Sequence, residues 1–557
     1  MKGIYLLALI FILGTVLRYW LLGDVPVSLH RDEAFLGYNA FSLLKTGRDM
    51  SGALLPLHFE SFIYSPGGYS YFSIPFTAVF GLSEFSVRFA SFIFGSLSIL
   101  LIYLVCKQLF NKEKLSNTIS LFAALLLAIS PWHINLSRTA TENAVVVFFI
   151  LLGTYLFMKW LRLENKVYLF SAFASFAVTL TLYQAPRVFL PLFIPLFIIL
   201  FINKKQFFKN KFILTGLYLF VIILPLIFIL TSQNLSTRIR SLSILNHEYT
   251  NLTVQEQIAN DGVAGVPYLV TRLFHNRWVT YSHVFLNNYF AHFSYPHLFS
   301  DEGFPERYKV PHAGILHLYI LPFFIMGSIY FILKRDKRYI FLIAWILISP
   351  IGSALASDDI PNLQRTLFML PPILIISAYG LIKVFTFVKL KKKLFYPSVS
   401  FVFLIIFLSL VYYLLQYYSQ APAYRPWLRQ DGYRELVSYT NSIKGDYKKI
   451  VITNRESAPT IFFLFYEKYD PSLFQKETKK SKLRDFDRVN FNGYEFTEQE
   501  CPVKMELDPN SNTEVLIGER GTLYINSGLC DIPEGAILLK TIKRADNSEV
   551  FHVLTVK

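Results

Sequence analysis

The chain has 557 residues, of which 53% are hydrophobic, 17% aromatic and only 17% charged. This composition is typical of a membrane-embedded chain and excludes an ordinary soluble enzyme. The net charge of +16 could indicate a nucleic-acid partner, but the lysines and arginines lie at the ends of apolar segments rather than on one soluble face, so membrane topology explains the charge instead.

Long apolar windows, each of about 17 to 25 residues, predict a polytopic α-helical membrane protein with about eleven transmembrane helices. The windows lie at 3–22, 84–106, 117–131, 142–161, 167–183, 186–203, 212–231, 313–333, 338–356, 366–388 and 396–418. The apolar stretch 70–83 is expected to be a re-entrant or interfacial piece.

Basic residues occupy alternate loops, which predicts the orientation of the chain. These loops are Lys107–Lys114, Lys159–Lys166, Lys204–Lys211, Lys334–Arg338 and Lys389–Lys393. By the positive-inside rule they face the cytoplasm, so the N-terminus is expected inside and the C-terminal part outside the cell membrane. The first apolar run lacks a small-residue cleavage site, and we expect it to be a retained helix.

The sequence changes character near residue 420, which divides the chain into a predicted transmembrane domain (1–419) and a predicted extracytoplasmic α/β domain (420–557). "GYRELVSYTNSI" has helical spacing, "KKIVITN" reads as a strand, and "APTIFFLFYEKY" as a helix or a second strand. Cys501 and Cys530 both lie in this tail, where an oxidising compartment favours a disulfide; two unpaired core cysteines remain the alternative.

No nucleotide-binding loop, CxxC pair or HExxH motif is present, so no cofactor is predicted and chemistry is expected from the outer loops. Carboxylates and arginines converge on that face. A carboxylate is suited to deprotonate a hydroxyl acceptor, and arginines are suited to hold a phosphate. The residues concerned are Asp32, Glu33, Glu60, Tyr64, His133, Arg138, Glu142, Arg187, Arg307, His312 and Arg365.

Four segments carry a family resemblance. In this order among apolar helices, "RDEAFLGYNAFSLLKTG", "SPGGYSYFSIPFTAVFGLSEF", "SPWHINLSRTATEN" and "SALASDDIPNLQR" resemble the GT-C glycosyltransferases of the protein O-mannosyltransferase and lipid A aminoarabinose transferase type. The resemblance covers roughly 1–390. It implies a GT-C fold and an inverting transfer of a sugar from a polyprenyl-phosphate donor to a hydroxyl acceptor on protein, lipid or cell-surface glycan.

The resemblance also implies roles for particular residues. Asp32 matches the acidic residue that acts on the acceptor, and Glu33 and Glu60 are the further catalytic candidates. Donor phosphate contacts are expected from three arginines, ranked Arg138, Arg365 and Arg307. A substrate pocket is expected to include His133, Glu142, Arg187, Tyr64 and His312.

The chain departs from the aminoarabinose enzymes at two places. Ser61 and Phe62 replace a lysine and a proline after the second acid, and Phe35 and Leu36 stand where those enzymes have a phosphate-binding Arg-Tyr pair. These sequence differences do not favour a zinc site at Glu60, and no metal is predicted.

Each residue also has a structural interpretation. Asp32 and Glu33 could cap a helix, His133 could belong to an interfacial aromatic belt, and Arg187 and Arg365 could anchor helix ends. At the level of function, a flippase or transporter of lipid-linked glycans and a structural or receptor role are the alternatives. A transporter would rather place charges in the middle of its helices and show repeated halves. The sequence shows no such repeat, and the charges on one loop face favour the transferase.

Overall fold

The computed structural model describes residues 2–59, 65–231, 243–246, 248–457, 459–478, 489–507 and 513–556. They form two compact units. Unit 1 consists of residues 1–19, 91–137 and 142–414, and unit 2 of residues 20–90, 138–141 and 415–557. The domain division predicted at residue 419 stays a prediction.

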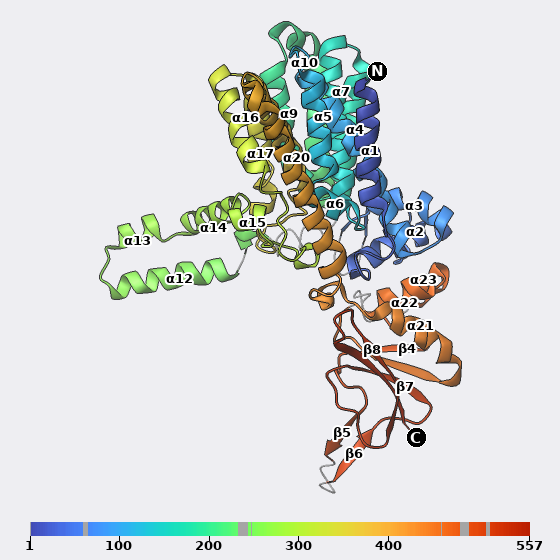
Figure 1. Cartoon of the computed structure of the whole chain (residues 1–557). Coiled ribbons are helices and arrows are strands. Elements are labelled where there is room, and N and C mark those ends of the chain that lie inside the picture. The colour runs from blue at the N-terminus through green and yellow to red at the C-terminus, as the bar shows by residue number, and fades with distance from the viewer. Residues whose placement is uncertain are drawn as a thin grey trace. The chain divides into compact units, whose positions relative to one another are not determined.

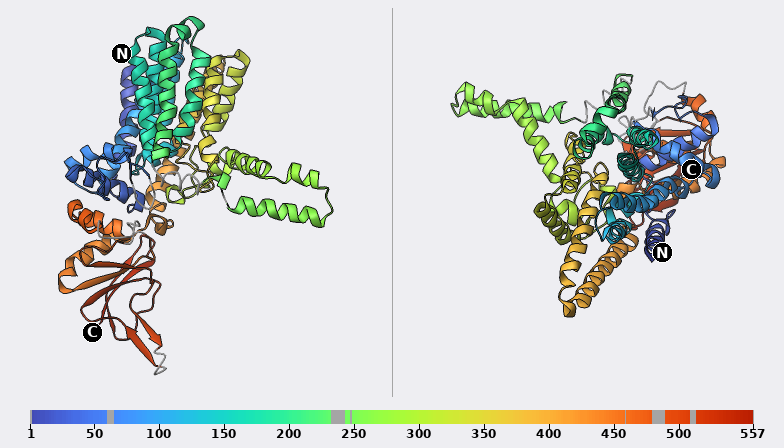
Figure 2. Two further views of the ribbon diagram at one scale, coloured as in Figure 1. Left: turned by 180° about the vertical axis from the view of Figure 1, so that it is seen from behind. Right: turned by 90° about the horizontal axis from the view of Figure 1, so that it is seen from above.

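Unit 1 is a bundle of apolar helices that run alongside one another in all views (Figures 1 and 2). Its main helices are α1 (Lys2–Tyr19), α4 (Glu84–Leu109, shared with unit 2), α5 (Ser116–Ala128), α6 (Pro131–Ser137), α7 (Glu142–Leu163), α8 (Lys166–Leu182), α9 (Pro186–Phe201), α10 (Lys204–Thr231), α16 (Ile320–Lys334), α17 (Lys337–Ile348), α18 (Ile351–Ala354), α19 (Leu370–Val388) and α20 (Lys392–Leu415).

Among the described residues, six helices are long and apolar enough to cross a membrane, and a seventh span is formed if α5 and α6 are counted together. Shorter apolar helices occupy Gly3–Tyr19, Lys166–Leu182, Pro186–Phe201 and Ile320–Lys334. Every predicted window therefore contains an apolar helix, and the chain is a multi-pass helical membrane protein. The exact number of spans and their orientation stay predictions.

The third predicted span, 117–131, is not one straight helix. It breaks after Ala128, and α6 then continues at an angle of 57°. Pro131 begins α6. Because proline has no N–H group and fits the first position of a helix, it restarts the helix here instead of continuing α5.

Between α10 and α16, the described residues of unit 1 include four helices. They are α12 (Glu248–Val263), α13 (Tyr268–Phe274), α14 (Arg277–Ala291) and α15 (Tyr295–Phe299). In Figures 1 and 2, α12 to α14 extend sideways from the bundle.

Unit 2 contains the first loop of the chain and the tail. Its helices are α2 (Arg31–Thr46), α3 (Gly68–Phe80), α21 (Tyr433–Ile443), α22 (Pro459–Glu467) and α23 (Pro471–Thr478). The predicted interfacial piece at 70–83 is thus helix α3. Helix α2 packs closely, since a Cβ atom on Gly37 would lie 2.5 Å from a methyl group of Val87 and 2.8 Å from the ring of Phe465.

The tail forms a five-stranded sheet in the order β4-β3-β7-β9-β8, which confirms the predicted α/β character. The strands are β3 (Lys449–Thr453), β4 (Tyr494–Thr497), β7 (Thr522–Ser527), β8 (Ala536–Lys543) and β9 (Glu549–Val556). β3 is parallel to both neighbours, and β9 is antiparallel to both. Separate two-stranded pairs are β1 (His58–Phe59) with β2 (Ser65–Pro66) and β5 (Lys504–Leu507) with β6 (Glu514–Ile517).

Aromatic rings join the helices of the tail to its sheet. Tyr433 of α21 stacks on Phe462 of α22 and contacts Phe551 of β9 edge to face. Phe463 of α22 packs on Tyr494 of β4. The segment that the sequence left open between helix and strand is therefore a helix, because its consecutive phenylalanines meet both α21 and the sheet.

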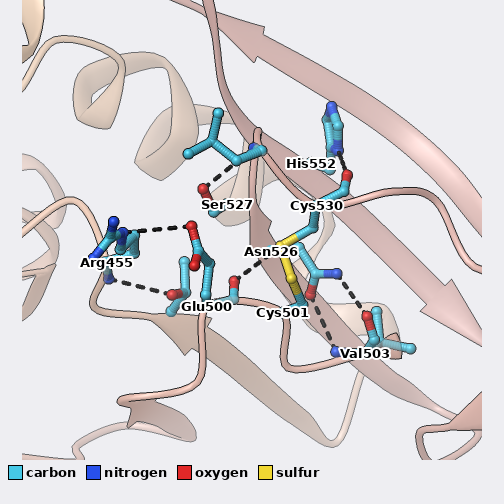
Figure 3. Close-up of a disulfide and its surroundings, with 10 residues drawn as sticks. Arg455, Glu500, Cys501, Val503, Asn526, Ser527, Cys530 and His552 are labelled. Carbon is cyan, nitrogen blue, oxygen red and sulfur yellow. Dashed lines mark hydrogen bonds and ion pairs between the residues drawn. A yellow bond between two sulfur atoms is a disulfide. The ribbon is translucent and has the colours of Figure 1, made fainter. Parts of the chain in front are cut away.

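A disulfide joins Cys501 and Cys530, as predicted (Figure 3). Beside it, the side chain of Asn526 pairs with both backbone groups of Val503 at 2.7 and 3.1 Å. The bridge therefore fastens the loop after β4 to the end of β7.

We expect loss of this bridge to destabilise the tail by about 3 kcal/mol, because it closes a loop of 29 residues in the unfolded chain. Urea-dependent proteolysis of the purified protein, with and without reductant, measures the effect. The Cys501→Ser/Cys530→Ser double variant is the control and should not respond to reductant. Two titratable thiols in the tail before reduction would contradict the prediction.

Candidate active site

The stretch "HRDEAF" opens helix α2 of unit 2. His30 is the N-cap residue, and its Nδ1 atom accepts a hydrogen bond from the Asp32 N–H at 3.2 Å. In return, the Glu33 carboxylate accepts the His30 N–H at 3.2 Å, which completes a capping box. The helix cap is thus His30, so the interpretation of Asp32 as the cap is wrong, whereas Glu33 does take part in capping.

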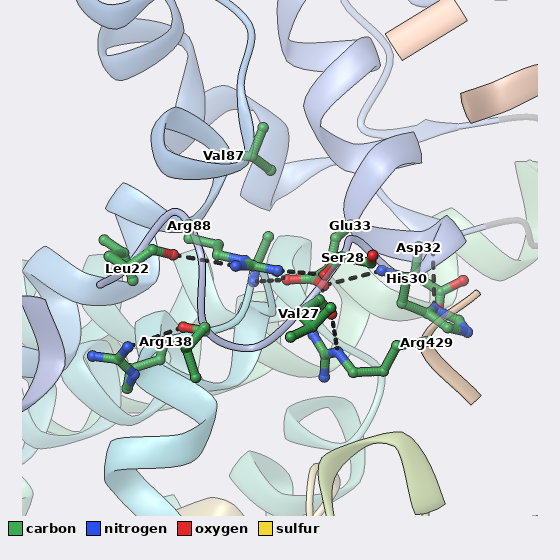
Figure 4. Close-up of polar contacts among 12 residues, drawn as sticks. Leu22, Val27, Ser28, His30, Asp32, Glu33, Val87, Arg88, Arg138 and Arg429 are labelled. Carbon is green, nitrogen blue, oxygen red and sulfur yellow. Dashed lines mark hydrogen bonds and ion pairs between the residues drawn. The ribbon is translucent and has the colours of Figure 1, made fainter. Parts of the chain in front are cut away.

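Glu33 is completely buried, and four groups donate to its carboxylate (Figure 4). Arg88 Nε lies 3.4 Å from Oε1 and the Ala140 N–H donates to the same oxygen at 2.7 Å. Arg429 donates to Oε2 at 3.0 Å, beside the His30 N–H. A buried carboxylate is stable only with partners of this kind.

Two opposing effects set the pKa of Glu33. Burial alone would raise it, but Arg88, Arg429 and the two backbone N–H groups outweigh burial and hold the pKa below its usual value. Glu33 therefore stays ionised at neutral pH and has no free position for a substrate proton. This arrangement fits a positioning role for Glu33 better than the predicted catalytic role, which stays untested.

Three arginines also hold the first loop, Leu21–Ser28, by its backbone carbonyls. Arg88 donates to Leu22 O at 3.2 Å and Ser28 O at 2.6 Å. Arg138 donates to Val25 O at 2.9 Å, and Arg429 to Val27 O at 3.2 Å. Leu21 and Ser28 both have positive φ, at 53° and 58°, so these contacts stabilise a backbone that non-glycine residues rarely adopt.

The sequence predicts Arg138 as the first of three arginines to contact the donor phosphate. Its surroundings, however, favour a structural role. Its side chain is fully buried. Besides the loop carbonyls, the guanidinium contacts the rings of Tyr417 and Tyr418 at 5.4 and 5.2 Å from their centroids. The predicted phosphate contact would require these groups to move.

Asp32 lies next to Glu33 but in a different environment. Its side chain is 30% exposed, while that of Glu33 is 0% exposed. Asp32 Oδ2 lies 3.3 Å from His30 Nδ1, and Oδ1 lies 3.9 Å from Arg31 Nε. Glu33 is fixed by four donors at the start of α2, whereas the neighbouring Asp32 carboxylate is partly exposed, with its Oδ1 atom buried. Such a pair, one carboxylate buried and one accessible, is an arrangement that separates structural and chemical roles.

In unit 1, three of the predicted residues gather around Tyr183. Arg365, Arg307 and Glu142 each interact electrostatically with Tyr183. Arg365 also donates to Asp358, to its carbonyl and to its carboxylate, both at 2.8 Å. Two arginines beside a tyrosine provide donors of the kind that bind a phosphate, and Glu142 and the Asp358 carboxylate balance their charge here.

The remaining predicted residues of unit 1 lie elsewhere. His133 is fully buried, with Nδ1 2.9 Å from a guanidinium nitrogen of Arg18, so it does not line an accessible pocket. Arg187 donates to Leu180 O and to the Gln184 side chain. His312 is exposed. Its backbone N–H donates to the Asp301 carboxylate, and its carbonyl accepts the Tyr412 hydroxyl.

Glu60 and Tyr64 lie outside the described residues, so their predicted roles stay predictions. Within the described ranges, no three His, Cys, Asp or Glu side chains are close enough to hold a metal ion. The expectation of no cofactor remains untested.

Arg88, Arg429 and Tyr183 were missed by the sequence reasoning. The position of Arg88 inside the apolar window 84–106 was a usable signal, since an ionisable residue in such a window needs a specific partner. Arg429 carried no comparable signal, because its partner Glu33 is 396 positions away.

The comparisons confirm the predicted resemblance, and the solved structures that this chain matches have a similar fold. ArnT from Cupriavidus metallidurans superposes with a TM-score of 0.51 at 10% identity, over 98% of this chain and 97% of that one. The oligosaccharyltransferase AglB from Archaeoglobus fulgidus also gives a TM-score of 0.51, at 14% identity, over 84% of this chain.

The sequence comparisons concern shorter regions. A family model described as dolichyl-phosphate-mannose-protein mannosyltransferase matches residues 65–229. The protein named "Putative mannosyltransferase YkcB" from Bacillus subtilis (strain 168) is 34% identical over 95 residues, which are 17% of this chain. The match spans 13% of that relative, and the chain spans 63% of AglB.

Proposed function

We propose that this protein is an inverting glycosyltransferase that moves a sugar from a polyprenyl-phosphate donor to a hydroxyl acceptor. The observation that carries the proposal is the pair of neighbouring carboxylates at the start of α2. Glu33 is buried and held by two arginines, and Asp32 beside it is accessible. In a GT-C fold this arrangement supplies one fixed, accessible base.

In this mechanism Asp32 accepts the proton of the acceptor hydroxyl. The acceptor oxygen then attacks the anomeric carbon from the face opposite the phosphate, and the bond from the sugar to the phosphate oxygen breaks. The polyprenyl phosphate leaves with the bonding electrons. One displacement inverts the anomeric centre, and no covalent sugar intermediate is needed.

Arg365 and Arg307 are the residues we propose for the donor phosphate. Both lie within electrostatic range of Tyr183 in unit 1, and forked guanidinium groups neutralise a departing phosphate well. ArnT has been solved with undecaprenyl phosphate bound, and AglB in complex with a dolichol-phosphate. These relatives support a lipid phosphate as the leaving group here.

The proposed reaction takes place at the outer face of the membrane. A reporter that is active only outside the cytoplasm should therefore work when fused after Lys557 and fail when fused near Lys392. This expectation rests on the basic residues of alternate loops. Equal reporter activity at both positions would contradict it.

The decisive experiment follows a radiolabelled sugar. The purified protein is incubated with a polyprenyl-phosphate hexose and membrane extract as the source of acceptor, and label is measured on the carrier and on the acceptor. Transfer of label supports a glycosyltransferase. Label that crosses a vesicle membrane while still on its carrier would instead support the alternative, a flippase of lipid-linked glycans.

A further inference from the structure

Helices α12, α13 and α14 of unit 1 form an arm, residues 248–291, that extends sideways from the bundle (Figures 1 and 2). No residue of α14 is buried. α12 lies beside α14 and contributes exposed Leu252 and Val263.

The arm exposes large apolar side chains along most of its length. Leu269 is 81% exposed, Trp278 77% and Phe290 62%. The other exposed apolar residues of α13 and α14 are Tyr268, Val270, Leu273, Phe274, Val279 and Leu286. Exposed apolar side chains in this number are typical of a surface that contacts a protein or a membrane.

The charge of α13 and α14 favours one of these two partners. Residues 264–291 contain no aspartate or glutamate and carry exposed Arg272 and Arg277, whereas the acidic residues of the arm, Glu248, Glu256 and Asp261, all lie in α12. The Arg272 guanidinium lies over the Tyr268 ring, 5.2 Å from its centroid. Arginines beside exposed aromatic and apolar side chains are typical of helices that lie in the interface of a bilayer with anionic lipids.

The base of the arm lies at the end of a membrane-spanning helix. The Asn288 side chain donates to Ala354 O at 3.3 Å and to Ala356 O at 3.1 Å, and the Tyr289 hydroxyl donates to Leu347 O at 2.7 Å. Leu347 and Ala354 belong to the last turns of the candidate span Lys337–Ala354. The arm therefore leaves the bundle at the depth at which this span leaves the hydrocarbon.

We propose that the arm is a membrane-interface anchor. Its apolar and aromatic side chains lie at the boundary between headgroups and acyl chains, and Arg272 and Arg277 bind anionic lipid headgroups. The partner is thus the lipid surface itself rather than a second copy of the chain.

The anchor also bears on how the lipid-phosphate donor binds. This step rests on the proposed function. His292, just after α14, accepts the Asn362 N–H at 3.1 Å, and the Asn362 side chain accepts the Arg365 N–H at 2.8 Å. The depth of the arm therefore sets the depth of Arg365. A lipid phosphate lies at the same level of the membrane, so the anchor places this arginine at the height of its ligand.

Site-directed spin labelling tests the anchor without any activity assay. Trp278→Cys in the full chain is labelled with a nitroxide and reconstituted in vesicles of equal parts phosphatidylcholine and phosphatidylglycerol. Labelling is selective, because the native cysteines are a disulfide and the buried Cys106. The matched control is Glu514→Cys, which labels an exposed position of β6.

At position 278 we expect a ratio of accessibility to oxygen over accessibility to a water-soluble nickel complex several-fold higher than at position 514. The Arg272→Glu/Arg277→Glu variant should reduce this ratio in anionic vesicles. Equal ratios at the two positions would overturn the proposal. Spin–spin broadening at position 278 that disappears on dilution with unlabelled protein would also overturn it, in favour of contact between copies. Failure of the glycosyltransferase proposal would leave these ratios unchanged.

Discussion

Replacing Asp32 by asparagine should lower sugar transfer by roughly 100-fold or more, which is the usual effect of losing a general base. Asparagine keeps the shape of the side chain but cannot take up a proton at neutral pH. Since Asp32 is not the cap of α2 and its side chain is 30% exposed, the substitution leaves the contacts of Glu33 in place. The initial rate of label transfer at saturating donor measures the loss.

Asp24→Asn is the matched control for this experiment. It makes the same chemical change at an exposed position of the first loop, and transfer should stay near the parent rate. Donor binding and the melting profile of the Asp32→Asn variant should also be unchanged. A folded Asp32→Asn protein that transfers sugar at the parent rate would show that Asp32 is not the base.

Replacing Glu33 by glutamine should instead destabilise unit 2, by about 3 kcal/mol, because it leaves two largely buried arginines without their carboxylate. Glutamine also brings an NH₂ group among four donors. Thermal unfolding of the purified protein measures the change. Glu506→Gln is the control: it removes an exposed partner of Lys504 3.8 Å away and should cost less than about 0.5 kcal/mol.

The pH dependence gives the Glu33 prediction a second measurement. Because the pKa of Glu33 is lowered in the folded state, its ionised form contributes stability above the pKa of the unfolded chain, and this contribution is lost as pH falls through the folded pKa. The stability difference between the parent and Glu33→Gln should therefore shrink on acidification. A difference that stays constant down to acid pH would show that the ionised carboxylate is not its source.

Sequence reasoning placed the apolar helices and the strand at 449–453 correctly because hydrophobic periodicity and β-branched runs are local signals. It missed the break at Ala128, although Pro131 was present in the window and proline seldom continues a helix. The disulfide was predicted only as one of two alternatives, since two cysteines fix no framework.

The candidate site was predicted in its residue types but not in its division of roles. Adjacent Asp32 and Glu33 look alike in the sequence. Their difference arises because Arg88, Ala140 and Arg429 reach Glu33 alone, from three distant parts of the chain. No local pattern encodes such long-range contacts, and for the same reason the contact of Arg138 with the first loop was not predicted.

The first loop and Glu33 depend on an arginine that is synthesised late. Arg429 follows the last predicted span, so it leaves the ribosome only after every membrane helix has been made. Until then, Val27 lacks its guanidinium donor and Glu33 has only Arg88 as a cationic partner. The start of α2 therefore reaches its final form only after the membrane helices have been translated.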